Sequence, residues 1–308
     1  MKHQFTIFTP THNRAHLIGG LYESLKRQTC KDFVWLVIDD GSTDNTSEII
    51  KSFQNEKKLD IEYRFIENGF LYLAEKLSAQ IADSQYIIRI DDDDQLLDNC
   101  VECFLLEWKN IEKEGIADIG EIRALAVRED GKIAGNYQPV IGSPPIDTTY
   151  IERHLSGEKQ LENIACRKVE VWKQLFHKDD TQKWLFDKVN YVEDCLLWFR
   201  LSRVCRTRYV FIPLRLYCDN PISITHNNLS STYQHQYNKI FGNYMILNEM
   251  SDYYWKAPHY FLKHLYSFGL RGFSAKLPYR KMVCALDNIL CKTIFVLASP
   301  LLYLRSKC

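Results

Sequence analysis

Four short apolar runs, separated by helix-like segments, occupy the first 125 residues and constrain the fold more than any other feature. The runs cover residues 4–8, 33–38, 61–66 and 86–90, and the helix-like segments cover residues 16–29, 43–54 and 71–83. Strands that alternate with helices in this way predict a mostly parallel sheet with helices on both faces. In such sheets, ligands bind at the carboxyl ends of the strands.

Three of the predicted strands end in polar segments. "TPTHNR" (9–14) follows the first strand, "DDGSTDNT" (39–46) follows the second, and "DDDD" (91–94) follows the fourth. Because the carboxyl ends of parallel strands meet at one edge of the sheet, we expect these segments to form a single rim. Three convergent segments indicate a functional site more strongly than any one of them.

The four aspartates at 91–94 admit four explanations. A solvated acidic turn fits poorly directly after a buried strand. A calcium loop is rejected, because Leu96 stands where such a loop needs glycine and a strand precedes it. A phospho-acceptor, Asp39 or Asp91, would leave the chain length and a later acidic motif unexplained. The fourth explanation is a carboxylate cluster that holds Mg²⁺ or Mn²⁺ against a diphosphate, since hard cations prefer oxygen ligands and neutralise the repelling acids.

The segment from "FTPTHNR" to "IDDGSTDNT", followed by "YIIRIDDDD", resembles the inverting family 2 glycosyltransferases. The resemblance is close over residues 4–99 and continues more weakly to about 226. It implies the GT-A fold, a nucleotide-diphospho-sugar donor (UDP-linked in our prediction), Mn²⁺ or Mg²⁺ as the cofactor, and inversion at the anomeric carbon.

The same resemblance implies roles for residues on the donor side. The nucleoside would be contacted by the segment Pro10, Thr11, His12 and Asn13, in which His12 replaces the usual tyrosine, and by Asp39 and Asp40. Asp40 would accept hydrogen bonds from the base or ribose. Lys76 matches a basic donor contact, although bulky side chains at 70–72 depart from the glycine-rich segment of the family.

The metal site is implied by the match of Asp91 and Asp93 to the Asp-x-Asp motif. Asp93 would be the main direct ligand, Asp94 would support it, and Asp92 occupies the variable position on the donor side. In some relatives a histidine further along adds a ligand, which makes His226 a candidate. A lone histidine is more often structural or exposed.

A predicted helix at 191–204 opens on Glu193 and Asp194. Acids at this position can simply complement the helix dipole and cap the helix. Inverting transfer, however, needs a carboxylate that takes the proton from the attacking hydroxyl. The resemblance matches this pair to the Glu-Asp motif of the family and implies that Asp194 is the catalytic base.

Composition excludes some classes and favours one compartment. The 39 basic and 39 acidic side chains give no net charge that would recruit nucleic acid. Ten cysteines without regular spacing suit a reducing environment, and no signal-peptide pattern precedes the first strand, so the cytoplasm is favoured. Cys100 and Cys103 lack a second pair with zinc spacing and are interpreted as packing residues.

Residues 282–304 are strongly apolar but interrupted by Asp287, Lys292 and Pro300. The charge-free stretch 293–304 is shorter than the roughly 20 residues that span a bilayer. Basic residues lie nearby. An interfacial helix on an anionic leaflet fits this arrangement, as does a helix packed on the catalytic domain or on a second subunit of a homodimer.

We therefore predict a GT-A catalytic domain at 1–230, with a nucleotide-binding half (1–125) and an acceptor-side half (126–230), and a helical region at 231–308. The predicted function is metal-dependent sugar transfer to a glycan or lipid-linked glycan. Two alternatives stay open: a membrane-associated scaffold that binds the nucleotide sugar without turnover, and a sugar nucleotidyltransferase. The second lacks the glycine-rich phosphate loop that it needs after the first strand.

Overall fold

A computed structural model of the chain describes residues 2–67, 70–157, 161–177, 180, 183–189, 191–192, 194–218 and 233–307, with the side chains at 194, 233 and 234 excepted. The chain forms two compact units. The first contains residues 1–176 and 201–221, and the second contains residues 177–200 and 222–308. Each unit is described by itself below.

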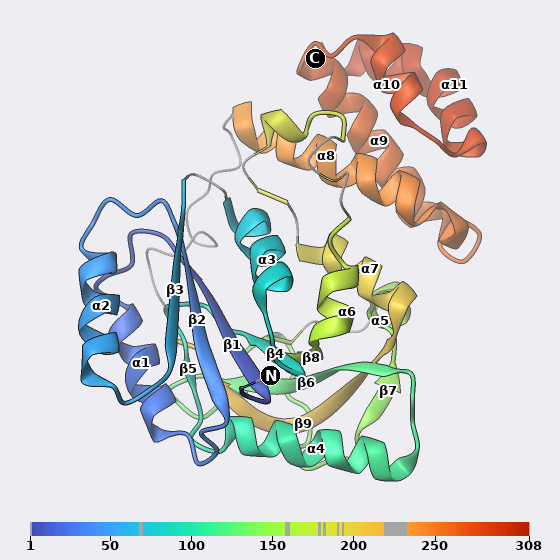
Figure 1. Cartoon of the computed structure of the whole chain (residues 1–308). Coiled ribbons are helices and arrows are strands. Elements are labelled where there is room, and N and C mark those ends of the chain that lie inside the picture. The colour runs from blue at the N-terminus through green and yellow to red at the C-terminus, as the bar shows by residue number, and fades with distance from the viewer. Residues whose placement is uncertain are drawn as a thin grey trace. The chain divides into compact units, whose positions relative to one another are not determined.

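The first unit is built on one mixed sheet, with the strand order β3-β2-β1-β4-β8-β6-β9-β5 and with β7 paired to β9 (Figure 1). The strands β3, β2, β1 and β4 run parallel to one another, whereas β8 is antiparallel to both β4 and β6. Strand bounds are β1 Phe5–Thr11, β2 Phe33–Asp40, β3 Ile61–Ile66, β4 Tyr86–Arg89, β5 Gln95–Leu96, β6 Ile119–Val127, β7 Ile146–Thr148, β8 Asn163–Lys168 and β9 Arg206–Leu216.

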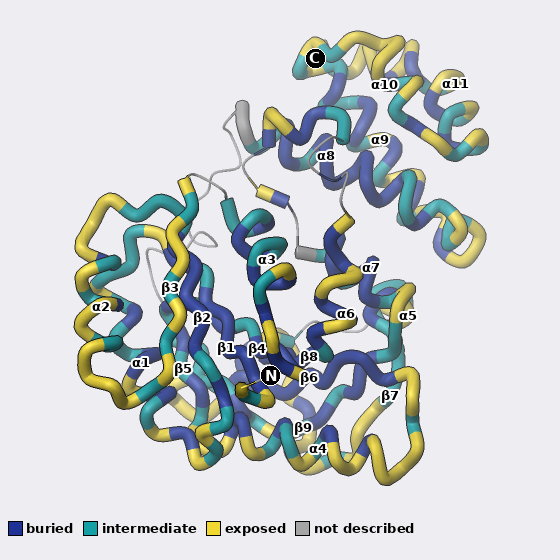
Figure 2. The backbone as a smooth tube through the Cα atoms, in the orientation of Figure 1, coloured by how far each residue is buried: buried dark blue, intermediate teal, exposed yellow. Residues whose placement is uncertain are grey.

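Helices flank this sheet on both faces. One buried cluster combines α1, α2 and α4 with sheet residues such as Phe5 and Trp35, while α3 packs on the other face of β1 and β2. Buried positions line the inside of these elements in Figure 2. Helix bounds are α1 Ile18–Arg27, α2 Thr46–Glu56, α3 Phe70–Ile81, α4 Cys100–Glu114, α5 Tyr150–Leu155, α6 Val169–Gln174 and α7 Asp194–Val204, which crosses into the first unit from the second.

The alternation read from the sequence is confirmed element by element. Each of the four predicted strands and three predicted helices occurs, with ends shifted by a few residues. After β6, the amide of Arg128 donates to the carbonyl of Lys132 at 2.8 Å and closes a turn that contains Asp130 and Gly131. Cys100 is buried and Cys103 half-buried in α4, as expected of packing residues.

The second unit is helical. Its helices are α8 Tyr233–Glu249, α9 Pro258–Ser274, α10 Tyr279–Ala285 and α11 Ile289–Arg305, with two short 3₁₀ turns, η2 Phe186–Lys188 and η4 Ser251–Tyr253. Helices α9 and α11 approach closely at Gly269, where an added Cβ would lie 2.6 Å from Leu302 Cδ1. In the part of the chain that is described, no helix has the length and apolar character needed to cross a membrane.

Candidate active site

The predicted rim exists at the carboxyl ends of the parallel strands. Parallel pairing sets Thr11 of β1 beside Asp39 of β2, and Phe8 of β1 beside Arg89 of β4. The segment 91–94 leaves the sheet directly beyond Arg89. The polar segments after β1, β2 and β4 therefore lie on neighbouring strand ends, because the strand order brings the three together.

The loop after β1 is tied to the loop after β2. The ring Nδ1 of His12 donates to the carbonyl oxygen of Asp40 at 2.7 Å. Asn13, in the left-handed region at φ 54°, accepts at Oδ1 from the amides of Thr43 (2.8 Å) and Asp44 (3.2 Å). His12 is exposed, and its orientation is fixed by this bond and by a contact of 3.1 Å between its Nε2 and Nδ2 of Asn13.

Asp39 is buried and fully engaged by its own surroundings. Its Oδ1 accepts from the amide of Ser42 at 2.8 Å, and its Oδ2 accepts from the hydroxyl of Tyr63 at 2.7 Å. Burial and the nearby carboxylate raise the pKa of Tyr63, so the phenol stays a donor. Asp39 thereby fixes the turn into α2, and Asp40, half-exposed at the end of β2, is the member of the pair that reaches solvent.

Asp91 is half-exposed and faces two cations. Its carboxylate lies 3.1 Å from Nη2 of Arg89 and 3.8 Å from Nη2 of Arg215. Arg89 is in turn held by the buried Glu75 of α3, whose Oε1 lies 2.9 Å from Nε of Arg89. Desolvation opposes ionisation of Asp91, but the charges of Arg89 and Arg215 outweigh it and lower its pKa.

Asp94 is only 2% exposed and is also held from the protein side. Arg215, near the end of β9, forms an ion pair with Oδ2 of Asp94, and the amide of Cys218 donates to Oδ1 at 3.0 Å. Burial raises the pKa of Asp94 to about 6 against the opposing charge of Arg215. Both oxygens of Asp94 therefore bind protein groups.

Asp92, 7% exposed, points back into the sheet. Its Oδ2 accepts from the hydroxyl of Thr11 at 2.6 Å. Desolvation, with repulsion from Asp93 and Asp91, raises the pKa of Asp92 to about 7 although the bond from Thr11 opposes this shift. Thr11, whose contact with the donor stays a prediction, thus binds the aspartate loop in this structure.

Asp93 differs from its three neighbours. It is half-buried, and within the described ranges its carboxylate has no hydrogen bond or ion pair to another residue. A carboxylate held beside three others, with none of its oxygens engaged by the described protein, fits the oxygen chemistry of a hard divalent cation. The residues present therefore suit the implied Mg²⁺ or Mn²⁺.

The structure describes only some of the other predicted site residues. Pro10 is the penultimate residue of β1, and Lys76 lies in the second turn of α3 directly after Glu75. Asp194 is the first residue of α7, which confirms a helix start there, but its side chain and all of Glu193 lie outside the described residues. His226 also lies outside them.

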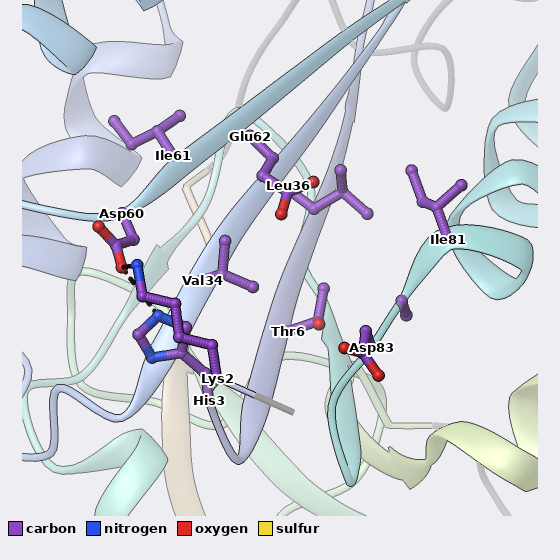
Figure 3. A pocket seen from close by; sticks show the side chains of 11 residues that line it. Lys2, His3, Thr6, Val34, Leu36, Asp60, Ile61, Glu62, Ile81 and Asp83 are labelled. Carbon is purple, nitrogen blue, oxygen red and sulfur yellow. Dashed lines mark hydrogen bonds and ion pairs between the residues drawn. The ribbon is translucent and has the colours of Figure 1, made fainter.

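A pocket of about 270 Å³ lies at the opposite, amino-terminal ends of the strands (Figure 3). Lys2 and His3 contact Asp60 at its mouth, at 2.7 and 2.8 Å. Thr6, Val34 and Leu36 of the sheet form its floor. The charges of Lys2, His3 and Asp60 are thus paired with one another.

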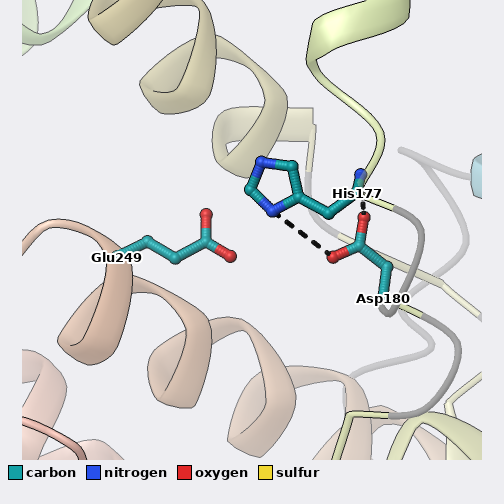
Figure 4. A group of neighbouring side chains, drawn as sticks. All are labelled: His177, Asp180 and Glu249. Carbon is teal, nitrogen blue, oxygen red and sulfur yellow. Dashed lines mark hydrogen bonds and ion pairs between the residues drawn. The ribbon is translucent and has the colours of Figure 1, made fainter.

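In the second unit, His177, Asp180 and Glu249 offer ligand atoms within 4.8 Å of one another (Figure 4). Arg200, however, donates to both oxygens of Asp180 at 2.9 and 2.8 Å, and to both oxygens of Glu249 at 2.8 and 2.7 Å. A metal ion would have to displace this guanidinium. The group is an ion-pair network that ties the 180 region to α8.

Residues 6–141 match the model of glycosyl transferase family 2. A region of 104 residues, 33% of this chain, is 34% identical to chondroitin synthase of Pasteurella multocida (strain Pm70). The match covers 11% of the length of that enzyme. Residues 6–141 therefore carry a domain of the family 2 glycosyltransferase type.

Solved structures agree on the fold. S. aureus TarS 1-349 in complex with UDP-GlcNAc superimposes with a TM-score of 0.59 at 15% identity, covering 98% of this chain and 89% of TarS. GalNAc-T7 with UDP, GalNAc and Mn²⁺ gives 0.54 at 14% identity, covering 96% and 55%. The fold is the expected GT-A type, a mixed sheet flanked by helices with helices at the C-terminal end.

Sequence reasoning missed the cations of the site. Arg89 and Arg215 lie in strand-like runs. Because polar and apolar residues alternate along a strand, the sequence suggests only that these two arginines face outward. The position of Arg89 in the sequence was a usable signal, because Arg89 lies only two positions before Asp91. Arg215 gave none, since only the pairing of β5 with β9 brings it to the loop.

Proposed function

We propose that this chain is a metal-dependent, inverting glycosyltransferase that moves a sugar from a nucleotide-diphospho-sugar to a hydroxyl group. The observation that carries the proposal is the division of the aspartate loop. Asp91, Asp92 and Asp94 are held by the protein, and Asp93 is left available at the rim of a family 2 domain.

The metal would be held by Asp93, with Asp91 beside it. A bound Mn²⁺ or Mg²⁺ would supply Lewis-acid stabilisation of the negative charge on the departing diphosphate. The two arginines that flank the loop support this role. They compensate Asp91 and Asp94, so the loop carries enough charge for a cation without the repulsion of four unpaired acids.

The donor proposed is UDP-linked. The family match and the likeness to TarS bound to UDP-GlcNAc support a nucleotide-sugar donor. His12, oriented by the carbonyl of Asp40, would lie against the base, and Asp40 would accept hydrogen bonds from the base or ribose. Pro10, Asn13 and Lys76 complete the donor set carried over from the sequence, with Thr11 and Asp39 acting through the loops that they hold.

Asp194 is proposed as the base that takes the proton from the attacking hydroxyl. Its support is the start of α7 at this residue, because a helix N-terminus favours the ionised carboxylate. His226 is kept as a candidate additional metal ligand. In this proposal residues 1–230 form the catalytic domain and residues 231–308 the helical region.

The acceptor proposed is a glycan or a lipid-linked glycan, and the site of action is the cytoplasm, with peripheral contact to the cytoplasmic face of the membrane. Polysaccharide biosynthesis is supported by the similarity to chondroitin synthase. Formation of a homodimer is a further part of the proposal that sedimentation would test.

Calorimetry of UDP binding with and without Mn²⁺ tests the proposal. We expect binding that requires the metal and that is lost in Asp93→Asn. Equal UDP affinity with and without Mn²⁺ would remove the metal site. Hydrolysis of nucleotide sugars in the absence of an acceptor then separates an enzyme from the non-catalytic scaffold, which would bind the donor but never cleave it.

A further inference from the structure

Helix α11 has an apolar side that its own unit does not cover. The opposite side packs on α9 at Gly269, where Phe295 and Leu302 approach so closely that an added Cβ would lie 3.1 and 2.6 Å from them. The outward side leaves four aliphatic side chains exposed: Ile289 (80%), Leu297 (75%), Leu301 (73%) and Leu304 (65%). The packing on α9 fixes the direction in which this side faces.

These four residues, here called the leucine stripe, follow helical spacing. Leu297, Leu301 and Leu304 stand four and three residues apart and so lie on one line along the helix. A helix at a protein surface normally turns charged and polar residues outward. Single exposed leucines are ordinary, but an aligned row of them marks an interaction surface. Figure 2 shows α11 with exposed positions along its length.

The segment that contains the stripe differs in charge from the whole chain. Residues 276–307 contain six basic side chains and one acidic side chain, a formal charge of +5, whereas the chain has a net charge of zero. Arg305 ends the helix and lies over the ring of Tyr266 at 5.7 Å, and Lys307, two residues further on, lies over the ring of Tyr303 at 4.9 Å. Tyrosine with lysine or arginine beside it is typical of a membrane interface.

We propose that the leucine stripe docks on the surface of an anionic lipid bilayer. The aliphatic side chains would enter the boundary between headgroups and acyl chains, and Arg305 and Lys307 would meet lipid phosphates. Because the other side of α11 is packed on α9, the helix would lie along the surface. The proposal rests on the proposed function in one respect: it would hold the transferase where a lipid-linked acceptor is located.

A second copy of the chain is a poorer occupant of the stripe. In a two-fold symmetric contact the same patch meets itself, so two segments of charge +5 would be brought together. An anionic bilayer instead attracts this charge while it covers the apolar side chains. Charge complementarity therefore selects the lipid surface.

The test is co-sedimentation of the full chain with vesicles of phosphatidylcholine alone and with added phosphatidylglycerol, at low and high salt and without donor. We expect binding to the anionic vesicles that falls by about tenfold or more in Leu297→Ser/Leu301→Ser, since each substitution removes aliphatic surface from the lipid. The matched control, Leu106→Ser/Val140→Ser, changes two residues that are 53% and 75% exposed in the first unit and should bind as the parent does.

The charge is tested by Arg305→Gln/Lys307→Gln, which should weaken binding to anionic vesicles several-fold and remove most of its salt dependence. Lys109→Gln/Lys113→Gln, on exposed positions of α4, is the control. Three results would overturn the proposal. The parent could fail to bind anionic vesicles, or the control pairs could lose as much vesicle binding as the test pairs. The third result is a chain that does not bind vesicles but forms a dimer that requires the leucine stripe. UDP calorimetry is independent, so a chain that binds vesicles but not UDP contradicts only the proposed function.

Discussion

Arg215 forms an ion pair with Asp94, and the two side chains are 11% and 2% exposed. Arg215 belongs to β9 in the second half of the domain, whereas Asp94 belongs to the loop after β4. The amide of Cys218 donates to the same carboxylate. The acidic loop is thus assembled from two parts of the chain, and its stability depends on both.

Loss of this cation should destabilise the domain. Removing one partner of a buried ion pair leaves an uncompensated charge and typically costs about 3–5 kcal/mol. We expect Arg215→Gln to lower the free energy of unfolding by an amount of this order, measured by urea denaturation. Arg215→Gln/Asp94→Asn should recover part of the loss, because no charge is then left unpaired.

The control for this pair is Arg64→Gln, which removes an exposed ion pair with Glu62 at 3.4 Å and should cost less than about 1 kcal/mol. If the double variant is no more stable than Arg215→Gln alone, the loss arises from something other than the unpaired carboxylate.

Asp93→Asn should abolish the dependence of UDP binding on Mn²⁺ while leaving the fold intact. The side chain has no partner to lose among the described residues, and Asn keeps its shape, so the melting temperature should change little. The control is Asp98→Asn, which changes an exposed acid two residues before α4 that pairs with Arg27, and this variant should bind UDP as the parent does. Unchanged metal-dependent affinity in Asp93→Asn would assign the metal to another ligand.

Asp194→Asn should retain donor affinity within about twofold and lower the rate of transfer by about 10²–10⁴-fold, the range for removal of a general base. Calorimetry with UDP and single-turnover transfer measure the two effects separately. Asp187→Asn changes an exposed acid shortly before α7 and should leave both unaffected. Full turnover in Asp194→Asn would exclude this residue as the base.

The burial of Asp92 predicts a dependence of stability on pH in metal-free protein. Its pKa is raised to about 7, above the unfolded value of about 4, so the folded state prefers the protonated acid. The contribution of protonated Asp92 to the free energy of unfolding is therefore fully present below about pH 4 and is lost as the pH rises through about 7. The free energy of unfolding of Asp92→Asn, taken relative to that of the parent, should therefore rise by on the order of 2–4 kcal/mol between these two pH values. Above about pH 8 this difference should stay constant.

Thermal or urea unfolding at several pH values in EDTA measures this difference, and Asp98→Asn provides the comparison for an exposed carboxylate. A difference between Asp92→Asn and the parent that does not change with pH would mean that Asp92 is ionised throughout.

The parts of the fold that sequence could predict are those set by local patterns. The runs that became β1, β2, β3 and β4 have apolar residues flanked by polar segments, and their parallel pairing brings the motifs to one rim. The roles within the rim were less accessible. Asp39 and Asp40 are adjacent in sequence, yet Tyr63 and Ser42 engage the first, and this depends on tertiary contacts.

The four aspartates show the same limit. The four residues are identical and consecutive, so the sequence alone does not distinguish them. In the fold, Asp92 is buried against Thr11, Asp91 and Asp94 pair with arginines, and Asp93 lies at the rim. Arg215 lies beside the aspartate loop only because β5 pairs with β9, and no local sequence pattern predicts such a long-range pairing.

The position of Arg215 has a practical consequence for minimal fragments of this protein. A piece cut at residue 141, the end of the family match, would retain every aspartate of the loop and every strand of the parallel half. It would lack the guanidinium that neutralises Asp94, along with β8 and β9. Such a fragment, cut at the motif boundary alone, would carry the acids of the loop after β4 without the counterion of Asp94.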